Sequence, residues 1–259
     1  MAVEMPTYLV QEKFAKLKFS EYVSVESSST PSTPLTPDTP LLPPPEPYHI
    51  RTIGKEDTER VLDFLRTFFF RDEPLNVDIK LLEGEQTCPD LEEFSLKAIK
   101  DNVSLMAITD SGKIIGVSLN GLIERNGAAD DDDLDVADPK FSKILGLLNY
   151  VDKEANVFER YPDVNKMILV EILSVDGSWR GQGIAKKLMN KTRDLAREQG
   201  VKLMRVDCTS HFSAKAIARL GFECIYKLKY EDYKENGLPV FDPEAPHKEV
   251  TVYIQRINQ

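Results

Sequence analysis

The fold is decided by residues 167–187, which read MILVEILSVDGSWRGQGIAKK. An apolar run from Met167 to Val175 has the length and composition of a buried strand, and a glycine-rich turn follows it. A helical pattern extends from Gly183 to Gln199, and Gly200 closes it. The next apolar run, Lys202 to Cys208, predicts a second strand. A strand, a helix and a strand within about 40 residues form a βαβ crossover, so we expect two neighbouring parallel strands.

The segments on either side supply the rest of a sheet and its covering helices. Apolar runs between turn residues predict strands at 48–53, 104–109, 114–123, 224–230 and 250–256. Apolar residues at helical spacing predict helices at 55–69, at 91–98, from 139 through 151 and at 213–220. The first of these is expected to end before Pro74. The fold class is therefore α/β, a single domain with a mixed central sheet flanked by helices.

The first 47 residues differ in composition from the remainder. They hold nine of the sixteen prolines, and the stretch from Glu26 to Pro47 is almost entirely Ser, Thr and Pro. Such a segment cannot bury enough apolar surface to offset its ordering entropy, so we expect residues 1–47 to be a disordered tail and residues 48–259 to form the domain. Four Thr-Pro dipeptides match the acceptor sites of proline-directed kinases, and a plain solvated tether is the alternative. These dipeptides begin at Thr30, Thr33, Thr36 and Thr39.

Charge and residue usage argue against several classes of protein. The formal charge of −10 disfavours a nucleic-acid-binding surface, which needs clustered Lys and Arg. No apolar window reaches the roughly 18 to 20 residues of a membrane span, and the N-terminus lacks the apolar stretch of a signal peptide, so a cytoplasmic location is expected. Cys88, Cys208 and Cys224 lack metal-ligand spacing, and the acidic run Asp130–Asp133 is interpreted as a solvated loop, so no metal site is predicted. A monomer is the default expectation.

The turn after the first parallel strand has the features of a phosphate site. The backbone N–H groups of residues 180–185 precede a helix N-terminus, where the helix dipole favours an anion. Glycines at 181 and 183 let the backbone approach a ligand closely, and Arg180, Lys186 and Lys187 add positive charge to an acidic protein. The turn lacks the Gly-Lys-Ser/Thr ending of a P-loop and the full dinucleotide fingerprint. A nucleotide hydrolase and a dehydrogenase are therefore disfavoured.

Two separated motifs resemble those of the GNAT acetyltransferases. Residues 180–185, Arg-Gly-Gln-Gly-Ile-Ala, match the Gln/Arg-x-x-Gly-x-Gly/Ala signature and follow Leu-Ser-Val at 173–175 on the expected strand. Ser213-Ala214, together with Arg219 to Phe222, is similar to the later segment whose helix lies against the pantetheine arm. The resemblance implies a GNAT fold with acetyl-CoA as co-substrate, bound where the two parallel strands splay apart.

The same resemblance implies which residues hold the cofactor. The backbone of Leu173 and Val175, on either side of Ser174, would pair with the pantetheine amides. Ser213 and Lys215 would approach the cofactor from the later helix, with Lys215 near its phosphates or adenosine. The pyrophosphate would be cradled by Arg180, Gly181, Gln182, Gly183, Ile184, Ala185 and Lys186.

Longer stretches resemble the insect arylalkylamine N-acetyltransferases and are spread across most of residues 48–259. They are TFFFRDEPLN at 67–76, GVSLNG at 116–121, PKF at 139–141 and TSHFSA at 209–214. This resemblance implies an aromatic amine acceptor such as dopamine, serotonin, tyramine or octopamine. It also implies that Glu73 is the general base, acting through ordered water, because an amine with a pKa near 10 must lose a proton before it attacks.

Other acceptor-side roles stay open at this point. Asp72 competes with Glu73 as the base. Ile217 replaces the tyrosine with which many GNAT enzymes protonate the leaving thiolate, and resemblance to the insect branch assigns Thr209 and Ser213 to the site instead. A helix N-cap is the alternative role for Ser213.

Substrate contacts and competing functions complete the expectations. Phe69, Asp72 and His211 are the candidate residues for binding the amine. An acetyl-enzyme on Cys208 with His211 as base is disfavoured, because a cysteine that ends a buried strand is usually inert. The alternative functions are a GNAT enzyme for a polyamine or a peptide amine and a non-catalytic acyl-CoA-binding module.

Overall fold

The computed structural model describes residues 46–84, 87–125 and 136–258. Residues 1–45 of the expected tail, with its Thr-Pro dipeptides, and the acidic run at 130–133 lie outside the described residues. The chain from residue 45 onward forms one compact unit.

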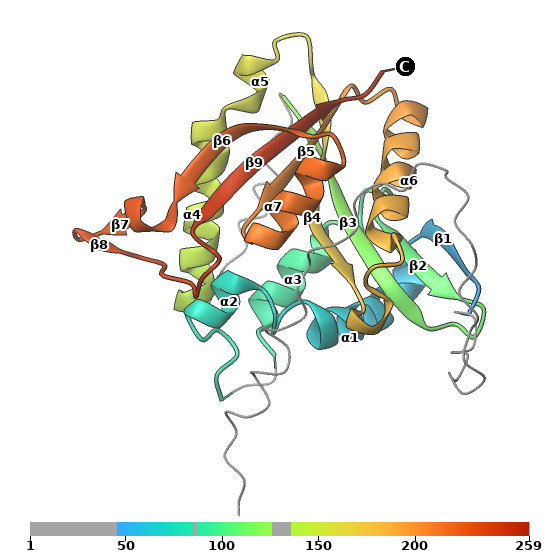
Figure 1. Ribbon diagram of the computed structural model, residues 1–259, viewed down its shortest axis with the longest axis horizontal. Coiled ribbons are helices and arrows are strands. Elements are labelled where there is room, and N and C mark those ends of the chain that lie inside the picture. Colours follow the sequence, from blue (N-terminus) through green and yellow to red (C-terminus); the bar gives the residue numbers. More distant parts are fainter. Residues whose placement is uncertain (1–45, 85–86, 126–135, 259) are drawn as a thin grey trace, which may run out of the picture. The chain divides into compact units, whose positions relative to one another are not determined.

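Seven strands form one mixed sheet in the order β1-β2-β3-β4-β5-β9-β6 (Figure 1). Strands β4 and β5 are parallel, and every other neighbouring pair is antiparallel. Helix α6 connects the two parallel strands, which confirms the α/β class and the predicted βαβ crossover. The strands are β1 (Tyr48–Thr52), β2 (Leu105–Thr109), β3 (Ile114–Glu124), β4 (Lys166–Val175), β5 (Leu203–Cys208), β6 (Glu223–Lys229) and β9 (Glu249–Arg256). A separate two-stranded ribbon consists of β7 (Lys234–Glu235) and β8 (Leu238–Pro239).

Helices cover both faces of the sheet. Strand β3 shows the division, because Val117 shares a core with α1, α3 and α4, whereas the neighbouring Gly116 lies against Ile184 and Leu188 of α6. Helix α7 joins the α6 side through Ile217, which is buried. In Figure 1, α1, α2 and α3 are seen in the lower part of the view, and α6 is seen on the right, above β1 and β2. The helices are α1 (Thr58–Phe68), α2 (Pro74–Asp78), α3 (Pro89–Lys97), α4 (Pro139–Ala155), α5 (Val157–Arg160), α6 (Ile184–Glu198) and α7 (His211–Arg219).

Helix α7 starts earlier than the sequence predicts, and the short helix α2 was not predicted. The predicted helix at 213–220 begins at His211, because Ser210 is its N-cap and accepts a hydrogen bond from the backbone N–H of Ser213 at 3.0 Å. The alternative role of Ser213 as the N-cap is therefore wrong. Pro74 follows the first helix, as expected, but it also starts the short helix α2, where proline is favoured at the first position.

The parallel strands separate part-way along their length. Pairing of β4 with β5 ends at Val170 and Val206, although β4 runs on to Val175. At the same point β4 carries a bulge, since Leu119 of β3 pairs with Ile172 and Asn120 pairs with Val170, which leaves Glu171 without a partner. A bulge bends its strand and increases the local twist, so it accounts for the separation. The edge of β4 at 171–175 is left without a strand partner on the β5 side.

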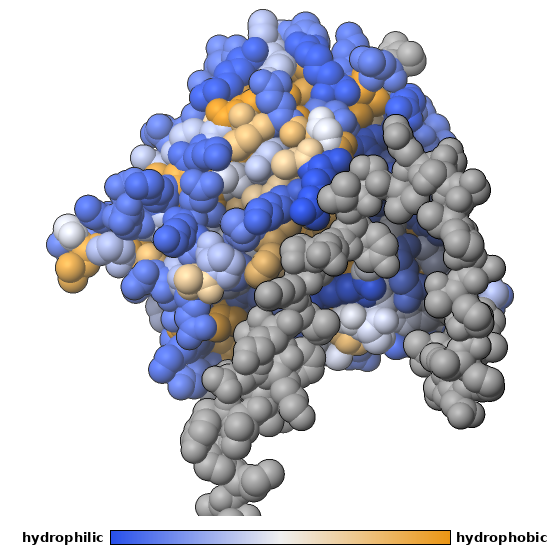
Figure 2. Space-filling model, viewed as in Figure 1, coloured by the Kyte–Doolittle hydropathy of each residue, from blue (hydrophilic) through white to orange (hydrophobic). Residues whose placement is uncertain are grey.

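Few large apolar side chains are exposed on the part of the chain that the structure describes. The face shown in Figure 2 is mostly hydrophilic, with apolar residues at the tip of the β7–β8 ribbon, where Leu238 is 71% exposed. Within the described ranges, no helix has the length and apolar character needed to cross a membrane.

Candidate active site

The glycine-rich turn presents open backbone at the start of α6. Gly181 and Gly183 have φ values of +82° and +75°, a conformation that side chains disfavour, and an added Cβ at either would meet nothing within 4 Å. Gly183 is the N-cap of the 15-residue helix α6, so the positive end of the helix dipole and its free N–H groups lie at this turn. The side chains of Arg180 and Lys186 are exposed beside it. The turn therefore leaves its backbone N–H groups open, in the arrangement that an anion-binding helix N-terminus needs.

Contacts with the first strands hold the turn in place. Asp176, which follows β4, accepts a hydrogen bond from the backbone N–H of Ser178 at 2.9 Å and pairs with the Nζ of Lys113 at 2.7 Å. The ring of Trp179 packs edge-on against Tyr48 of β1, with 6.1 Å between the ring centroids. The Nζ of Lys187 lies 4.7 Å from the same Tyr48 ring, within the range of a cation–π interaction. The turn is thus attached to β1 and to the β2–β3 connection.

Glu73 lies on the other side of the site, between α1 and α2. Its backbone is extended, and its Oε2 accepts a hydrogen bond from the backbone N–H of Asn76 at 2.8 Å, so Glu73 caps α2. Its second oxygen, Oε1, is fully buried and has no hydrogen-bond donor within the described part of the chain. Burial raises the pKa of Glu73, while the nearby Thr209 hydroxyl and the backbone N–H of Asn76 lower it. This carboxylate therefore has Oε2 held by the Asn76 N–H, an Oε1 that accepts no hydrogen bond, and the Thr209 hydroxyl nearby.

Thr209 is fixed by a tyrosine that the sequence did not point to. Thr209 follows β5, and its carbonyl oxygen accepts a hydrogen bond from the Tyr230 hydroxyl at 2.6 Å. Tyr230 is buried, and its pKa is raised by burial and further by the charge of Glu73. Glu73, Thr209 and Tyr230 come from three segments that are far apart in the sequence. Because Tyr230 belongs to no motif, no signal in the sequence could have identified it.

Ser213 lies in the first turn of α7, close to Thr209 in the chain. Its hydroxyl donates a hydrogen bond to the Ser210 carbonyl and accepts one from the Ser210 hydroxyl, each at 2.9 Å. Cys208 is buried behind this turn, and burial raises the pKa of its thiol to about 12. A thiol in this state is a poor nucleophile at neutral pH, which argues against an acetyl-enzyme.

Asp72 and Arg180 connect the acceptor side with the glycine-rich turn. The Oδ2 of Asp72 lies 3.7 Å from an Nη of Arg180, and both side chains are mostly exposed. The structure thus brings Asp72 next to the glycine-rich turn. Phe69 is partly buried and packs against Phe70 with 6.1 Å between ring centroids, while Phe70 itself is a core residue.

His211 pairs with a second histidine that the sequence reasoning missed. The backbone N–H of His211 donates to Nδ1 of His247 at 3.3 Å, and the ring of Phe212 contacts both histidine rings edge-on. Burial lowers the pKa of His247, and the nearby His211 lowers it further. Lys215 is exposed on α7, one turn beyond His211.

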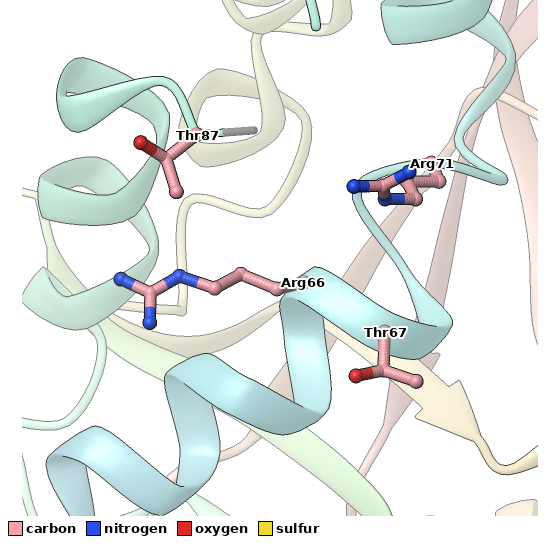
Figure 3. A pocket seen from close by; sticks show the side chains of 4 residues that line it. All are labelled: Arg66, Thr67, Arg71 and Thr87. Carbon is pink, nitrogen blue, oxygen red and sulfur yellow. The ribbon is translucent and has the colours of Figure 1, made fainter. Parts of the chain in front are cut away.

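An open hollow of about 470 Å³ lies beside the C-terminal end of α1 (Figure 3). It is lined by Arg66, Thr67, Arg71 and Thr87. The Arg66 guanidinium already forms two hydrogen bonds of 2.7 Å with the Glu92 carboxylate. None of the predicted site residues lines this hollow, so it is not the candidate active site.

Comparison with known proteins agrees with this geometry. The model of the acetyltransferase (GNAT) family matches residues 63–222, which include both the Glu73 segment and the glycine-rich turn. The chain belongs to the GNAT acetyltransferase family. Membership confirms the predicted fold and the prediction that the chain is an acetyltransferase, and it implies acetyl-CoA as the co-substrate. Within the described residues, no group of three or more His, Cys, Asp or Glu side chains is placed to hold a metal ion.

Solved structures of similar proteins indicate which acetyltransferases within the family this chain resembles. Arylalkylamine N-acetyltransferase 2 from Aedes aegypti is 38% identical with a TM-score of 0.76, over 82% of this chain and 99% of that one. Mosquito arylalkylamine N-acetyltransferase like 5b is 29% identical with a TM-score of 0.72, over 81% of this chain and 100% of that one. A polyamine N-acetyltransferase from Drosophila melanogaster, which forms N-acetylagmatine, is 26% identical with a TM-score of 0.70, again over 81% and 100%. The relatives therefore include enzymes for aromatic amines and for polyamines.

Proposed function

We propose that this protein transfers the acetyl group of acetyl-CoA to the primary amine of an arylalkylamine such as dopamine, serotonin, tyramine or octopamine. The 38% identity with a mosquito arylalkylamine N-acetyltransferase over nearly the whole of that chain supports this acceptor class. The TFFFRDEPLN and TSHFSA stretches support it as well, since Thr209 from the second stretch lies near enough to Glu73 from the first to lower its pKa.

The observation that carries the proposal is the buried, unpartnered Oε1 of Glu73. An arylalkylamine enters as an ammonium ion, and its nitrogen becomes a nucleophile only after a proton leaves. A carboxylate whose Oε2 is held by Asn76 and whose Oε1 is free can accept that proton, directly or through an ordered water. Burial raises the pKa of Glu73 towards the working pH, which is the direction that a general base needs.

Acetyl-CoA would bind along the unpaired part of β4 and over the glycine-rich turn. The free edge at 171–175 offers the backbone of Leu173 and Val175, flanking Ser174, to the pantetheine amides. Arg180, with Lys186 and the backbone N–H groups from Gly181 through Ala185, would hold the pyrophosphate. Lys215 is exposed on α7, where it can reach the outer part of the cofactor.

The transfer would be a direct attack in a ternary complex. The amine nitrogen forms a bond with the acetyl carbonyl carbon, the carbon–sulfur bond breaks, and the thiolate leaves. Ser213 would supply a proton to that thiolate after its hydroxyl turns away from the Ser210 carbonyl, to which it donates in the structure. The Thr209 hydroxyl lies near Glu73 and would favour the charged form of this base by lowering its pKa.

A polyamine acceptor is the second candidate, and the 26% identity with the Drosophila melanogaster enzyme supports it. The two are separated by measuring CoA release with acetyl-CoA and a panel of dopamine, serotonin, tyramine, agmatine, spermidine and a lysine peptide. We expect the highest kcat/KM among the arylalkylamines. Activity confined to agmatine and spermidine would show that the acceptor is a polyamine and not an arylalkylamine. Acetyl-CoA binding without any turnover would point to a non-catalytic module.

A further inference from the structure

Tyr230 occupies a central position behind the candidate base. It follows β6 directly, it is only 2% exposed, and its backbone N–H donates to the Lys248 carbonyl at 3.1 Å. Its ring packs at 6.3 Å from that of Phe241, which is also buried. The ring therefore has little freedom to move, and its hydroxyl is aimed at one acceptor, the Thr209 carbonyl.

The bond from Tyr230 to Thr209 matters because of where Thr209 lies. At 2.6 Å it is among the shorter hydrogen bonds of the described structure, and it holds the backbone at the junction between β5 and α7. The side chain of the same threonine lies beside the Glu73 carboxylate and favours its charged form. Removal of the Tyr230 hydroxyl would therefore change the position of Thr209 and, through it, the pKa of Glu73.

We propose that Tyr230 is a positioning residue for the acetyl transfer: its hydroxyl holds the Thr209 backbone so that the Thr209 side chain stays near the Glu73 carboxylate. The proposal rests on the function given above, in which Glu73 is the base. Tyr230 does not touch the substrate in this scheme. Its role is indirect: it holds Thr209 in the position from which the Thr209 hydroxyl lowers the pKa of Glu73.

A matched tyrosine in the same segment provides the control. Tyr233 lies three residues further on, and its ring stacks on Phe241 at 6.2 Å, so it shares the local packing of Tyr230. Its hydroxyl is directed towards Gly146 of α4 rather than towards Thr209. Tyr233→Phe therefore removes a phenol hydroxyl from the same cluster without affecting the path to Glu73.

The test is the pH dependence of kcat/KM for tyramine in wild type, Tyr230→Phe, Thr209→Val, the double variant and Tyr233→Phe. Loss of the Thr209 hydroxyl makes Glu73 harder to ionise, so the acidic limb should move up by about 0.5 pH unit, the low end of what a hydrogen bond contributes. Tyr230→Phe should move the limb in the same direction, lowering kcat/KM about threefold below pH 6 and less above pH 8. The double variant should match Thr209→Val, since both changes act on one contact.

Two results would overturn the proposal. The first is an acidic limb in Tyr230→Phe that coincides with those of wild type and Tyr233→Phe while thermal unfolding shows the variant folded. The second is a double variant whose shift is the sum of the two single shifts, since that would mean independent actions. Inactive wild-type protein would instead contradict the proposed function, so the two failures are distinguishable. Tyr230→Phe keeps the ring and its packing on Phe241, and the unfolding curve verifies that it folds.

Discussion

Glu171 gives a prediction that does not depend on the catalytic proposal. The β4 bulge places its carboxylate over Gly121, where an added Cβ would lie 2.7 Å from Oε1. Within the described residues no Lys or Arg forms an ion pair with it, and the charged group that affects it is Asp101. Burial, with a smaller contribution from Asp101, raises the pKa of Glu171 from 4.5 to about 7.

The sign of the effect on stability follows from that shift. Between pH 4.5 and 7 the folded protein keeps a proton on Glu171 that the unfolded chain has released. Stability falls with rising pH wherever the folded state binds more protons, so this group destabilises the fold progressively through that window. The upper limit for a shift of this size is about 3 kcal/mol, and because the side chain is not completely buried we expect about 2 kcal/mol.

Glu171→Gln tests the prediction, because glutamine has a similar shape and does not ionise. The free energy of unfolding, measured in urea at pH 5, 6, 7 and 8, should show the variant gaining about 2 kcal/mol on wild type between pH 5 and pH 8. Taking the difference between two pH values cancels any fixed effect of the glutamine. Glu93→Gln, an exposed position on α3, should run parallel to wild type. A Glu171→Gln curve that is also parallel to wild type would refute the reasoning.

Three further predictions concern the buried ion pairs, the glycine-rich turn and the thiol. Arg205 is 1% exposed and forms two hydrogen bonds of 2.8 Å with Asp207, so Arg205→Met should cost about 3 kcal/mol or more in urea unfolding, and an unchanged midpoint would contradict this. Gly183→Ala should cost about 1 kcal/mol of stability because of its φ of +75° and should weaken acetyl-CoA binding at least fivefold by calorimetry; unaltered affinity would show that this turn is not the phosphate site. Cys208→Ala should keep kcat within about twofold, because no acetyl-enzyme is expected to form on Cys208. Loss of turnover in a folded variant would instead support an acetyl-enzyme intermediate.

The local features of this fold were predictable from the sequence because their causes are local. The apolar run of β4, the glycines of the turn and the pattern of α6 lie within residues 166–198, and the pairing of β4 with β5 follows from the short crossover. The position where the two strands separate was not predictable in detail. It depends on the bulge at Glu171, which is a matter of register between β3 and β4.

The helix caps show a different limit. Ser210 and Ser213 are both good N-cap residues, and the apolar pattern alone did not distinguish them. The structure selects Ser210, and the helix then starts at His211. The short helix α2 was missed because its five residues are too few to show a period, although Pro74 is a common first residue.

Some residues of the candidate site could be predicted from local motifs, and others could be found only from the fold. Glu73, Thr209 and the turn residues lie in motifs and could be named from the sequence. Tyr230 and His247 reach the site from the segment after β6, which carries no motif, so only the fold could bring them in. The ion pair of Asp72 with Arg180 is likewise a tertiary contact between segments that sequence analysis treated separately.

The most direct test of the central claim compares Glu73→Gln with Asp72→Asn. Turnover of tyramine is measured by CoA release, and acetyl-CoA affinity is measured by the fluorescence of Trp179, the only tryptophan in the chain, which lies in the glycine-rich turn. General-base catalysis contributes about 100-fold or more, so Glu73→Gln should lose at least that factor in kcat while the acetyl-CoA Kd changes less than about twofold. Asp72→Asn should keep most of its kcat. Near-normal turnover in Glu73→Gln, or a large loss in Asp72→Asn alone, would contradict the assignment of Glu73 as the base.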